Sequence, residues 1–278
     1  MDGVDFKRAM ARHADGPDEA HVRTCLAAYR DAGIRFVRDG GDAHGVSLLA
    51  ARLAPEYGID YRTPAFAIHK AGHYGHIVGR AFEDLRQYAQ LVEEAARLGA
   101  DFIKIMTTGI MDFDHFGRIT HEDLDAREVR EMVHIAHESG FAVMSHTNGK
   151  RAVLAALEAG VDSIEHGNYI DDECLDALAV SRTCYVPTAT VARNLRGTGR
   201  FDKDVLERIY EASLRAIAGA VERGCLVAVG SDAGAVGVLH GQGAHDEHAC
   251  FVQAVPDARV REAALDRGER FIRTTFAR

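Results

Sequence analysis

Four side chains that could take part in metal chemistry lie within short apolar runs or directly after them. His146, His166 and Asp232 each follow such a run, and Lys104 lies inside a fourth. Each run has the length of a β-strand and precedes a polar or glycine turn and then a helical pattern. Because the carboxyl ends of barrel strands carry the chemistry in α/β barrels, these side chains are expected to converge. The pattern predicts a metal site.

The two histidines are one strand–helix unit apart, so they are expected on adjacent strands. Two imidazoles at neighbouring strand ends can reach the same cation. The alternative is that each histidine caps its own strand and bonds a loop carbonyl, which is the commoner role of a single histidine. Asp232 lies in Gly-Ser-Asp-Ala-Gly. Its carboxylate could bind metal, accept a proton, or cap the next helix.

Lys104 alternates with Phe102 and Met106 along its strand. Its stem is therefore expected to point to the barrel interior or to the carboxyl end of the strand. An unpaired ammonium is costly in such a place. The lysine must then be paired, neutralised or chemically modified.

Helical and strand patterns alternate along the chain. Helices are predicted at residues 17–32, 46–57, 85–98, 125–138, 150–159, 172–180, 203–223 and 263–278. Strands are predicted at residues 34–38, 61–69, 100–106, 141–145, 161–165, 183–187 and 225–230. This alternation favours a TIM-type (β/α)8 barrel. Seven strands are one too few, so we expect a barrel incomplete at its N-terminus, where residues 2–12 make a poor strand ahead of the helix at Pro17.

Composition limits the function classes. The 278 residues, 47% of them hydrophobic, fit one domain over 1–278. A net charge of -9 disfavours a nucleic acid or an anionic membrane as partner and leaves a small molecule. Five cysteines without a C-x-x-C pair indicate reduced thiols and a cytoplasmic location. The sequence holds no apolar run long enough for a membrane span.

Five segments resemble the amidohydrolase superfamily of metal-dependent hydrolases, in its prolidase-like and imidazolonepropionase-like branch. They are FIKIM at 102–106, SHTNG at 145–149, DSIEHG at 162–167, VPT at 186–188 and GSDAG at 230–234. The resemblance implies a carbamylated Lys104 that bridges two divalent ions, with zinc as the expected metal. It implies that His146 and His166 bind the more buried ion, and that Asp232 binds the other and shuttles a proton. A metal-activated water would then attack an amide carbonyl.

The sequence departs from this family at its start. Members carry a His-x-His pair on the first barrel strand, and the sequence has none. The β-sandwich of many relatives also finds no matching segment. Either the start of the chain has been placed too far downstream, or this is a shortened barrel in which Lys104, His146 and His166 hold a single ion. A missing strand would leave unpaired sheet edges, which predicts either instability or a homo-oligomer that covers them.

Further residues could contact substrate. His73 and His76 lie in a glycine-rich loop after a strand, Tyr169 follows His166, and His240 follows Asp232. Alternatively, His73 and His76 are surface residues of this loop without a role in substrate binding. The expected function is hydrolysis of an amide bond in a cyclic amide or a dipeptide-like molecule. The alternatives are an inactive barrel with one ion or none, and a decarboxylase or esterase with the same metal chemistry, since fold and metal do not fix the substrate.

Overall fold

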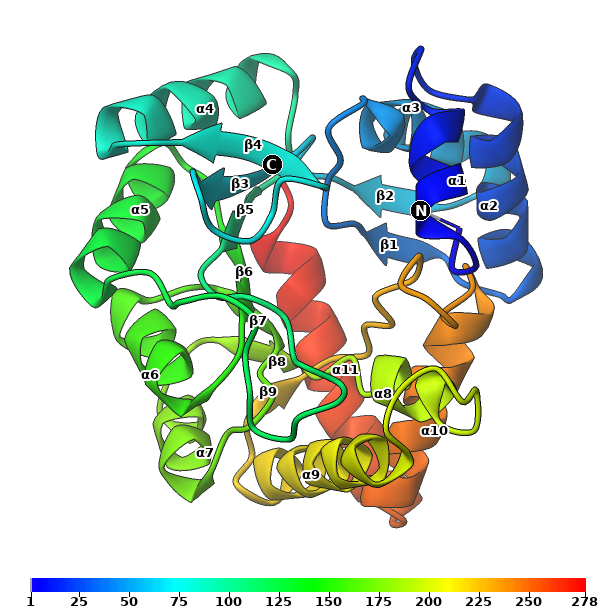
Figure 1. Cartoon of the computed structure of the whole chain (residues 1–278), viewed down its shortest axis with the longest axis vertical. Coiled ribbons are helices and arrows are strands. Elements are labelled where there is room, and N and C mark those ends of the chain that lie inside the picture. The colour runs from blue at the N-terminus through cyan, green and yellow to red at the C-terminus, as the bar shows by residue number, and fades with distance from the viewer. Residues whose placement is uncertain (1) are drawn as a thin grey trace.

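Parallel strands alternate with helices through the computed structural model, which describes residues 2–278 (Figure 1). The strands are β1 (Phe36–Arg38), β2 (Asp60–Arg62), β3 (Ala67–Lys70), β4 (Gly79–Phe82), β5 (Ile103–Met106), β6 (Val143–Thr147), β7 (Ser163–His166), β8 (Cys184–Val186) and β9 (Leu226–Val227). The helices are α1 (Phe6–Arg12), α2 (Glu19–Asp31), α3 (Val46–Leu53), the 3-10 helix Ala54–Tyr57, α4 (Leu85–Arg97), α5 (Ala126–Glu138), α6 (Lys150–Ala159), α7 (Asp172–Ala179), α8 (Thr190–Leu195), α9 (Lys203–Glu222), α10 (Gln242–Ala254) and α11 (Ala258–Thr275).

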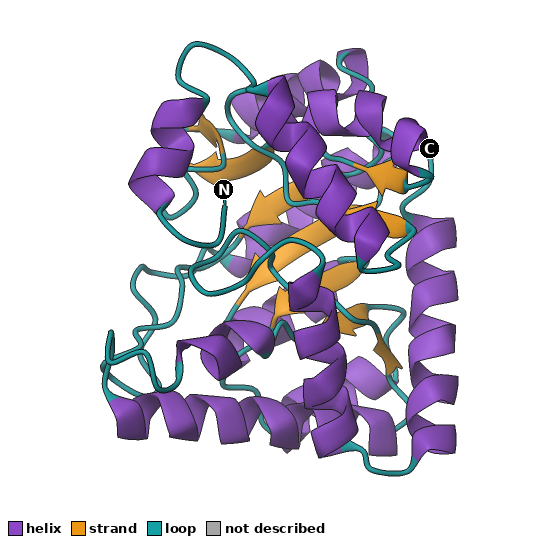
Figure 2. Cartoon of the chain, turned by 90° about the vertical axis from the view of Figure 1, so that its right-hand side faces the viewer, coloured by secondary structure: helices purple, strands orange, loops and turns teal. Residues whose placement is uncertain are grey.

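The strands form two hydrogen-bonded sheets, and every strand pair in them is parallel. One sheet has the order β4-β3-β5-β6-β7-β8-β9, and β1 pairs with β2 in the other. Figure 2 shows helices around the strands. This is the α/β architecture expected from the sequence. Since neighbouring strands run in the same direction, the ends of β5, β6 and β7 lie at one edge.

Aspartate side chains start many of the helices. Asp84, Asp125, Asp171 and Asp202 each precede a helix and accept a hydrogen bond from a backbone N–H of its first turn. Such caps satisfy amide groups that have no partner within the helix. They fix where each helix begins and therefore how long the preceding loop at the strand end can be.

The sheet has apolar residues on both faces, as a sheet between helices and a barrel interior requires. Ile105 and Ile164 belong to a core cluster shared with the helices α4 to α6. Phe102 and Met144 belong to a second cluster with Ile272. The alternation places Lys104, between Ile103 and Ile105, on the face of Phe102 rather than on the helix-covered face.

Helix α11 packs against β8 and β9. A Cβ added to Gly268 would lie 1.8 Å from the carbonyl oxygen of Val227, so α11 and β9 are in direct backbone contact. The ring of Phe276 lies 5.3 Å from that of Phe102, edge to face. The end of the chain therefore fills the interior below the candidate site.

The strand predicted at residues 61–69 is wrong, because it is two strands in different sheets. Residues 60–62 pair with β1, while residues 67–70 pair with β4 and β5. Pro64 lacks an N–H, and Ala65 has a positive φ of 65°, so the chain turns between them. The sequence predicts that Gly72, Gly75 and Gly79 share the loop after this strand, but Gly79 begins β4. A side chain there would collide with the carbonyl of Ala67.

Other boundaries also differ. Residues 6–12 form a helix whose N-cap is Asp5, where the sequence suggested only a poor strand. The helix predicted at 46–57 becomes 3-10 from Ala54, one residue before Pro55. Helices α8 and α10 were not predicted, and α11 begins earlier than residue 263. Among the helices of residues 2–278, none is both long and apolar enough to cross a membrane.

Candidate metal centre

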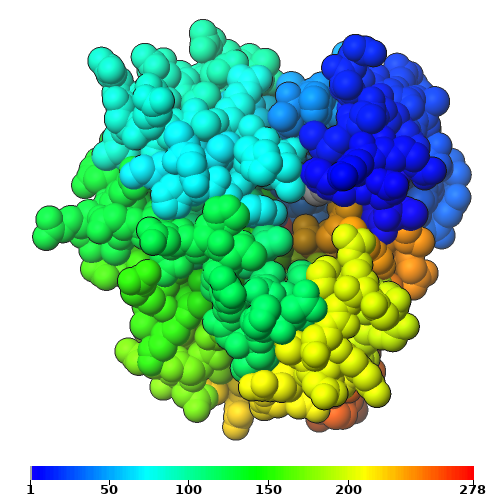
Figure 3. Space-filling model, viewed as in Figure 1, coloured from blue at the N-terminus to red at the C-terminus, as the bar shows by residue number. Residues whose placement is uncertain are grey.

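A cavity of about 560 Å³ opens at the carboxyl ends of the strands. Lys104 on β5, His146 on β6, His166 at the end of β7 and Asp232 after β9 all line it. The N-terminal helices supply part of the opposite wall, including Met10. Figure 3 shows a hollow bordered by the N-terminal segment in blue, a green segment, and the segment near residue 240 in orange. The four residues predicted from strand ends therefore share one cavity.

The two imidazoles lie next to each other. Their ring centroids are 4.6 Å apart and the rings are close to perpendicular. Nε2 of His146 lies 3.0 Å from the carbonyl oxygen of Gly109, and Nδ1 of His166 lies 2.7 Å from Oγ1 of Thr188. One nitrogen of each ring is thus engaged. Nδ1 of His146 and Nε2 of His166 have no hydrogen-bond partner within residues 2–278.

Both rings are held in the neutral form. Burial lowers the pKa of His146 well below its usual value, and lowers the pKa of His166 to about 3. The charge of Lys104 lowers both further. A neutral imidazole with its second nitrogen anchored by a hydrogen bond is the form that binds metal ions.

Lys104 is buried without a counter-ion. Its side chain makes no ion pair or hydrogen bond with the described residues, and the nearby carboxylate of Glu165 is already paired with Arg38. Burial lowers the pKa of Lys104 to about 8, and the charges of Glu165 and Asp232 oppose that shift. A substantial fraction of this amine is therefore neutral in mildly alkaline solution.

Asp232 is a carboxyl group in a dry environment. Burial raises its pKa, while Lys104 lowers it. Its backbone is also strained, with φ at 57°. His166 and Thr188 have φ angles of 71° and 51°, so a left-handed residue other than glycine lies at the end of β7 and in the loops after β8 and β9. Such strain concentrates at functional sites, where the fold holds side chains in specific positions.

The side chains of the cavity provide only some of the ligands that a divalent ion needs. Within residues 2–278, no three His, Cys, Asp or Glu side chains are grouped closely enough to hold a metal ion. His146 and His166 supply two adjacent donors, and a cationic Lys104 is not a ligand. A carbamylated Lys104 would add carboxylate oxygens beside them, so the residues fit a metal once this lysine is modified.

The predicted substrate-binding residues occupy different places. His240 lines the cavity, and its Nδ1 lies 3.0 Å from the hydroxyl of Tyr29. His73, His76 and Tyr169 are not among the lining residues, and Nδ1 of His73 lies 3.3 Å from the carbonyl oxygen of Glu122. A substrate role for these four residues stays a prediction.

Sequence reasoning missed several residues of the cavity. The ring of Tyr74 lies 5.2 Å from that of His146, and Asn148 donates from Nδ2 to the carbonyl of Gly109, 3.1 Å away. Thr188, the partner of His166, lies in the VPT segment without a role assigned from the sequence. The side chain of Asp39 lines the cavity and accepts a hydrogen bond from Tyr61, and its burial raises its pKa to about 6. No sequence signal marks Tyr74.

Comparison with known proteins identifies the family. Residues 18–266 match the Amidohydrolase family. The chain belongs to this family. Ochratoxinase from Aspergillus niger is 26% identical over 213 residues, which is 72% of this chain and 41% of that protein. An uncharacterized protein of Mycobacterium tuberculosis is 26% identical over 227 residues, 77% of this chain and 57% of the other.

Solved structures share the fold of this amidohydrolase-family chain. A Xaa-Pro dipeptidase with bound methionine superposes with a TM-score of 0.75 at 23% identity, over 90% of this chain and 67% of that one. The structure of Aspergillus niger ochratoxinase gives 0.72 at 20% identity, over 90% and 63%. The chain spans about two fifths to three fifths of the length of the curated relatives that it matches. The TIM-barrel type of α/β fold is thereby confirmed.

Proposed function

We propose that this chain hydrolyses an amide (C–N) bond in a small molecule, using a divalent ion and Asp232 as the group that moves the proton. The observation that carries the proposal is the pair of adjacent imidazoles that share one cavity with the buried Lys104. The names of the relatives, an ochratoxinase and a Xaa-Pro dipeptidase, favour a cyclic amide or a dipeptide-like substrate.

Lys104 is proposed to become a ligand by carbamylation. Its neutral amine adds to CO₂, a nitrogen–carbon bond forms, and the nitrogen loses a proton to give an anionic carbamate. Burial promotes this step because it lowers the pKa of the amine to about 8. The step replaces an unpaired buried cation with carboxylate oxygens. Together with His146 and His166 these oxygens would hold the ion, for which we propose zinc.

A divalent ion held there would polarise the amide carbonyl and lower the pKa of water. Asp232 is proposed to accept the proton of the attacking water and to pass it to the leaving nitrogen. Burial raises the pKa of Asp232 above the usual value of an aspartate. A carboxyl group with a raised pKa accepts a proton more readily, and it can still pass that proton to the leaving nitrogen.

The cavity suits a small and partly apolar substrate. Its volume of about 560 Å³ lies in the range of ligand sites, which is roughly 300–1,000 Å³. Met10, Leu26 and Phe201 supply apolar side chains to its walls from outside the strands, and Met106 lies beside His146 on the neighbouring strand. A substrate would therefore place its scissile amide near Lys104 and an apolar group against the other wall.

One observation favours a second candidate, a barrel that binds one ion or none and does not turn over. The unmodified side chains of residues 2–278 do not group into a three-ligand site. In that case, purified protein incubated with bicarbonate and zinc would remain without activity on every amide tested.

The test is a panel of N-acyl amino acids, Xaa-Pro dipeptides and cyclic amides, with release of the amine measured. We expect activity that needs zinc and bicarbonate and that Asp232→Asn lowers about 100-fold or more at unchanged zinc content. Glu158→Gln is the control, because this carboxylate is exposed on α6 and pairs only with Arg130. Equal activity of Asp232→Asn and the wild type would refute the proton-transfer role.

A further inference from the structure

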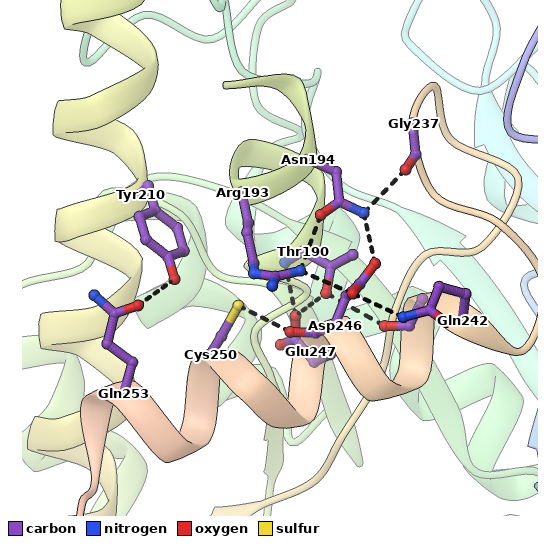
Figure 4. Close-up of polar contacts among 11 residues, drawn as sticks. Thr190, Arg193, Asn194, Tyr210, Gly237, Gln242, Asp246, Glu247, Cys250 and Gln253 are labelled. Atoms are coloured by element: carbon purple, nitrogen blue, oxygen red, sulfur yellow. Dashed lines mark hydrogen bonds and ion pairs between the residues drawn. The ribbon is translucent and has the colours of Figure 1, made fainter. Parts of the chain in front are cut away.

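Glu247 is a buried carboxyl group that the proposed reaction does not use. It lies on α10 with no exposed surface. Its Oε2 accepts two hydrogen bonds of 2.7 Å, from the backbone N–H and from the hydroxyl of Thr190 (Figure 4). Its Oε1 has no hydrogen-bond partner within residues 2–278. Burying a carboxyl group this completely is costly, so its retention calls for a function.

Glu247 bonds to the turn between β8 and α8. Thr190 begins α8, whose N-cap Ala189 provides no side-chain hydrogen bond. Glu247 on α10 therefore takes the place of the missing cap. Burial raises the pKa of Glu247 to about 7, and the hydroxyl and backbone N–H of Thr190 oppose that rise.

This turn contains the strained residue that contacts His166. Thr188 has a φ of 51°, a conformation that a β-branched residue rarely adopts. In this position its Oγ1 lies 2.7 Å from Nδ1 of His166. A turn released from Glu247 would relax to an ordinary backbone angle. The hydroxyl of Thr188 would then move away from the imidazole.

The neighbouring residue on α10 has a different set of contacts. Asp246 pairs with Arg193 at 2.9 Å and accepts a hydrogen bond from Asn194, which in turn donates to the carbonyl of Gly237 (Figure 4). These contacts lie further along α8 than Thr190 and do not include the turn at Thr188. Of these two neighbouring side chains on α10, Glu247 is thus the one that bonds to the turn before α8.

We propose that Glu247 is a positioning residue of the candidate metal centre. By fixing the turn from Thr188 to Thr190, it keeps the Thr188 hydroxyl against Nδ1 of His166. Nδ1 then carries the proton, and Nε2 presents its lone pair to the cavity. A hydrogen bond of this kind sets which nitrogen of a histidine binds a cation. The inference rests on the proposed function in assigning His166 as a ligand.

Three variants of the full chain separate this role from simple stability. Glu247→Leu removes both accepted hydrogen bonds, while Glu247→Gln keeps one oxygen that accepts from Thr190. Thr188→Val removes the hydroxyl that contacts His166. The matched control is Thr183→Val, because Thr183 is equally buried and donates a 2.7 Å hydrogen bond to Val161 at the opposite end of β8. Urea unfolding of the metal-free proteins records the stability of each.

The first readout is the zinc affinity, measured by competition with a chromophoric chelator in bicarbonate buffer. We expect Glu247→Leu and Thr188→Val each to weaken binding about 10- to 100-fold. Glu247→Gln should stay near the wild type, and Thr183→Val should lose stability without losing affinity. A variant that combines Glu247→Leu with Thr188→Val should bind zinc no more weakly than the weaker-binding of the two single variants, because both substitutions act through the contact between Thr188 and His166. Wild-type affinity in a folded Glu247→Leu protein would overturn the proposal.

The second readout needs no metal. Long-range proton–nitrogen spectra of metal-free protein report the His166 tautomer, with His166→Asn providing the assignment. We expect a proton on Nδ1 in the wild type and a mixture of tautomers in Glu247→Leu and Thr188→Val. If the wild type binds no zinc but the tautomers change as expected, the proposed function fails and the positioning role stands. A proton on Nε2 in the wild type, or an unchanged tautomer in both variants, would overturn the positioning role.

Discussion

Arg38 and Glu165 form an ion pair inside the barrel. Nη2 of Arg38 lies 2.8 Å from Oε1 of Glu165, and the two side chains are only 6% and 5% exposed. Arg38 also donates to Oγ of Ser163 at 2.8 Å, and its guanidinium lies 4.2 Å from the ring of Phe276. Since β1 and β7 belong to different sheets, this pair connects the sheets directly.

Breaking this pair from one side should destabilise the fold strongly. We expect Arg38→Met to lower the free energy of unfolding by about 3–5 kcal/mol, because the buried Glu165 would lose the one cation within residues 2–278 that contacts its carboxylate. Arg130→Met removes an ion pair whose partners are both exposed, and should cost about 1 kcal/mol or less. Urea titration of both variants measures the difference. Similar losses would show that burial of the Arg38 pair contributes little.

Removing either imidazole should reduce metal binding. We expect His146→Ala and His166→Ala each to lower the zinc content of purified protein, because each ring offers an unengaged nitrogen to the cavity. Elemental analysis after dialysis provides the measurement. His248→Ala is the control, since that histidine is exposed on α10 and lies near Glu262. Full zinc content in both site variants would exclude the proposed ligands.

The metal-free protein should be destabilised by Lys104 in its cationic form. The pKa of Lys104 falls from 10.5 to about 8, so the unfolded chain binds this proton more tightly than the folded chain does. Its contribution to stability is therefore unfavourable below pH 8 and vanishes as the pH rises toward 10.5. Lys104→Met should stabilise metal-free protein at pH 7 by up to about 3 kcal/mol. This gain should shrink above pH 8 in urea titrations, and a gain independent of pH would contradict the assignment.

Gly268→Ala should destabilise the protein, although alanine usually favours a helix. An exchange of glycine for alanine within a helix normally adds roughly 0.5–1 kcal/mol of stability. At Gly268 the new methyl group would lie 1.8 Å from the carbonyl oxygen of Val227, so α11 must move away from β9. We expect a loss of about 1–3 kcal/mol or more. Thermal unfolding decides the sign, and a rise in the melting temperature would refute the close contact.

The sequence predicts the central helices and strands best where local signals are strong. Aspartate caps such as Asp84 and Asp125 mark helix starts, and apolar runs mark β5 to β8. The N-caps of α8 and α10 are Ala189 and Gly241, which provide no side-chain hydrogen bond, so the starts of these helices carry no such signal. The split between β2 and β3 depends on which sheet each segment joins, and that is decided by tertiary contacts.

The candidate site divides in the same way. Lys104, His146, His166 and Asp232 could be placed together because parallel strands bring their carboxyl ends to one edge. Tyr74 could not be placed, and neither could the contact of Glu247 with the turn after β8. Tyr74 reaches the cavity from a loop, and Glu247 acts through a helix that contacts the turn after β8. Such contacts depend on how distant segments pack, which periodicity does not encode.

The packing of Phe276 against Phe102 has a consequence for biosynthesis. Phe276 follows Phe102 in the sequence by more than half the length of this chain. Strands β5 to β9 emerge from the ribosome before this ring is available, so their inner face stays open to water and to other nascent chains. Chaperones that shield apolar surface should therefore act on this protein until translation has passed Phe276.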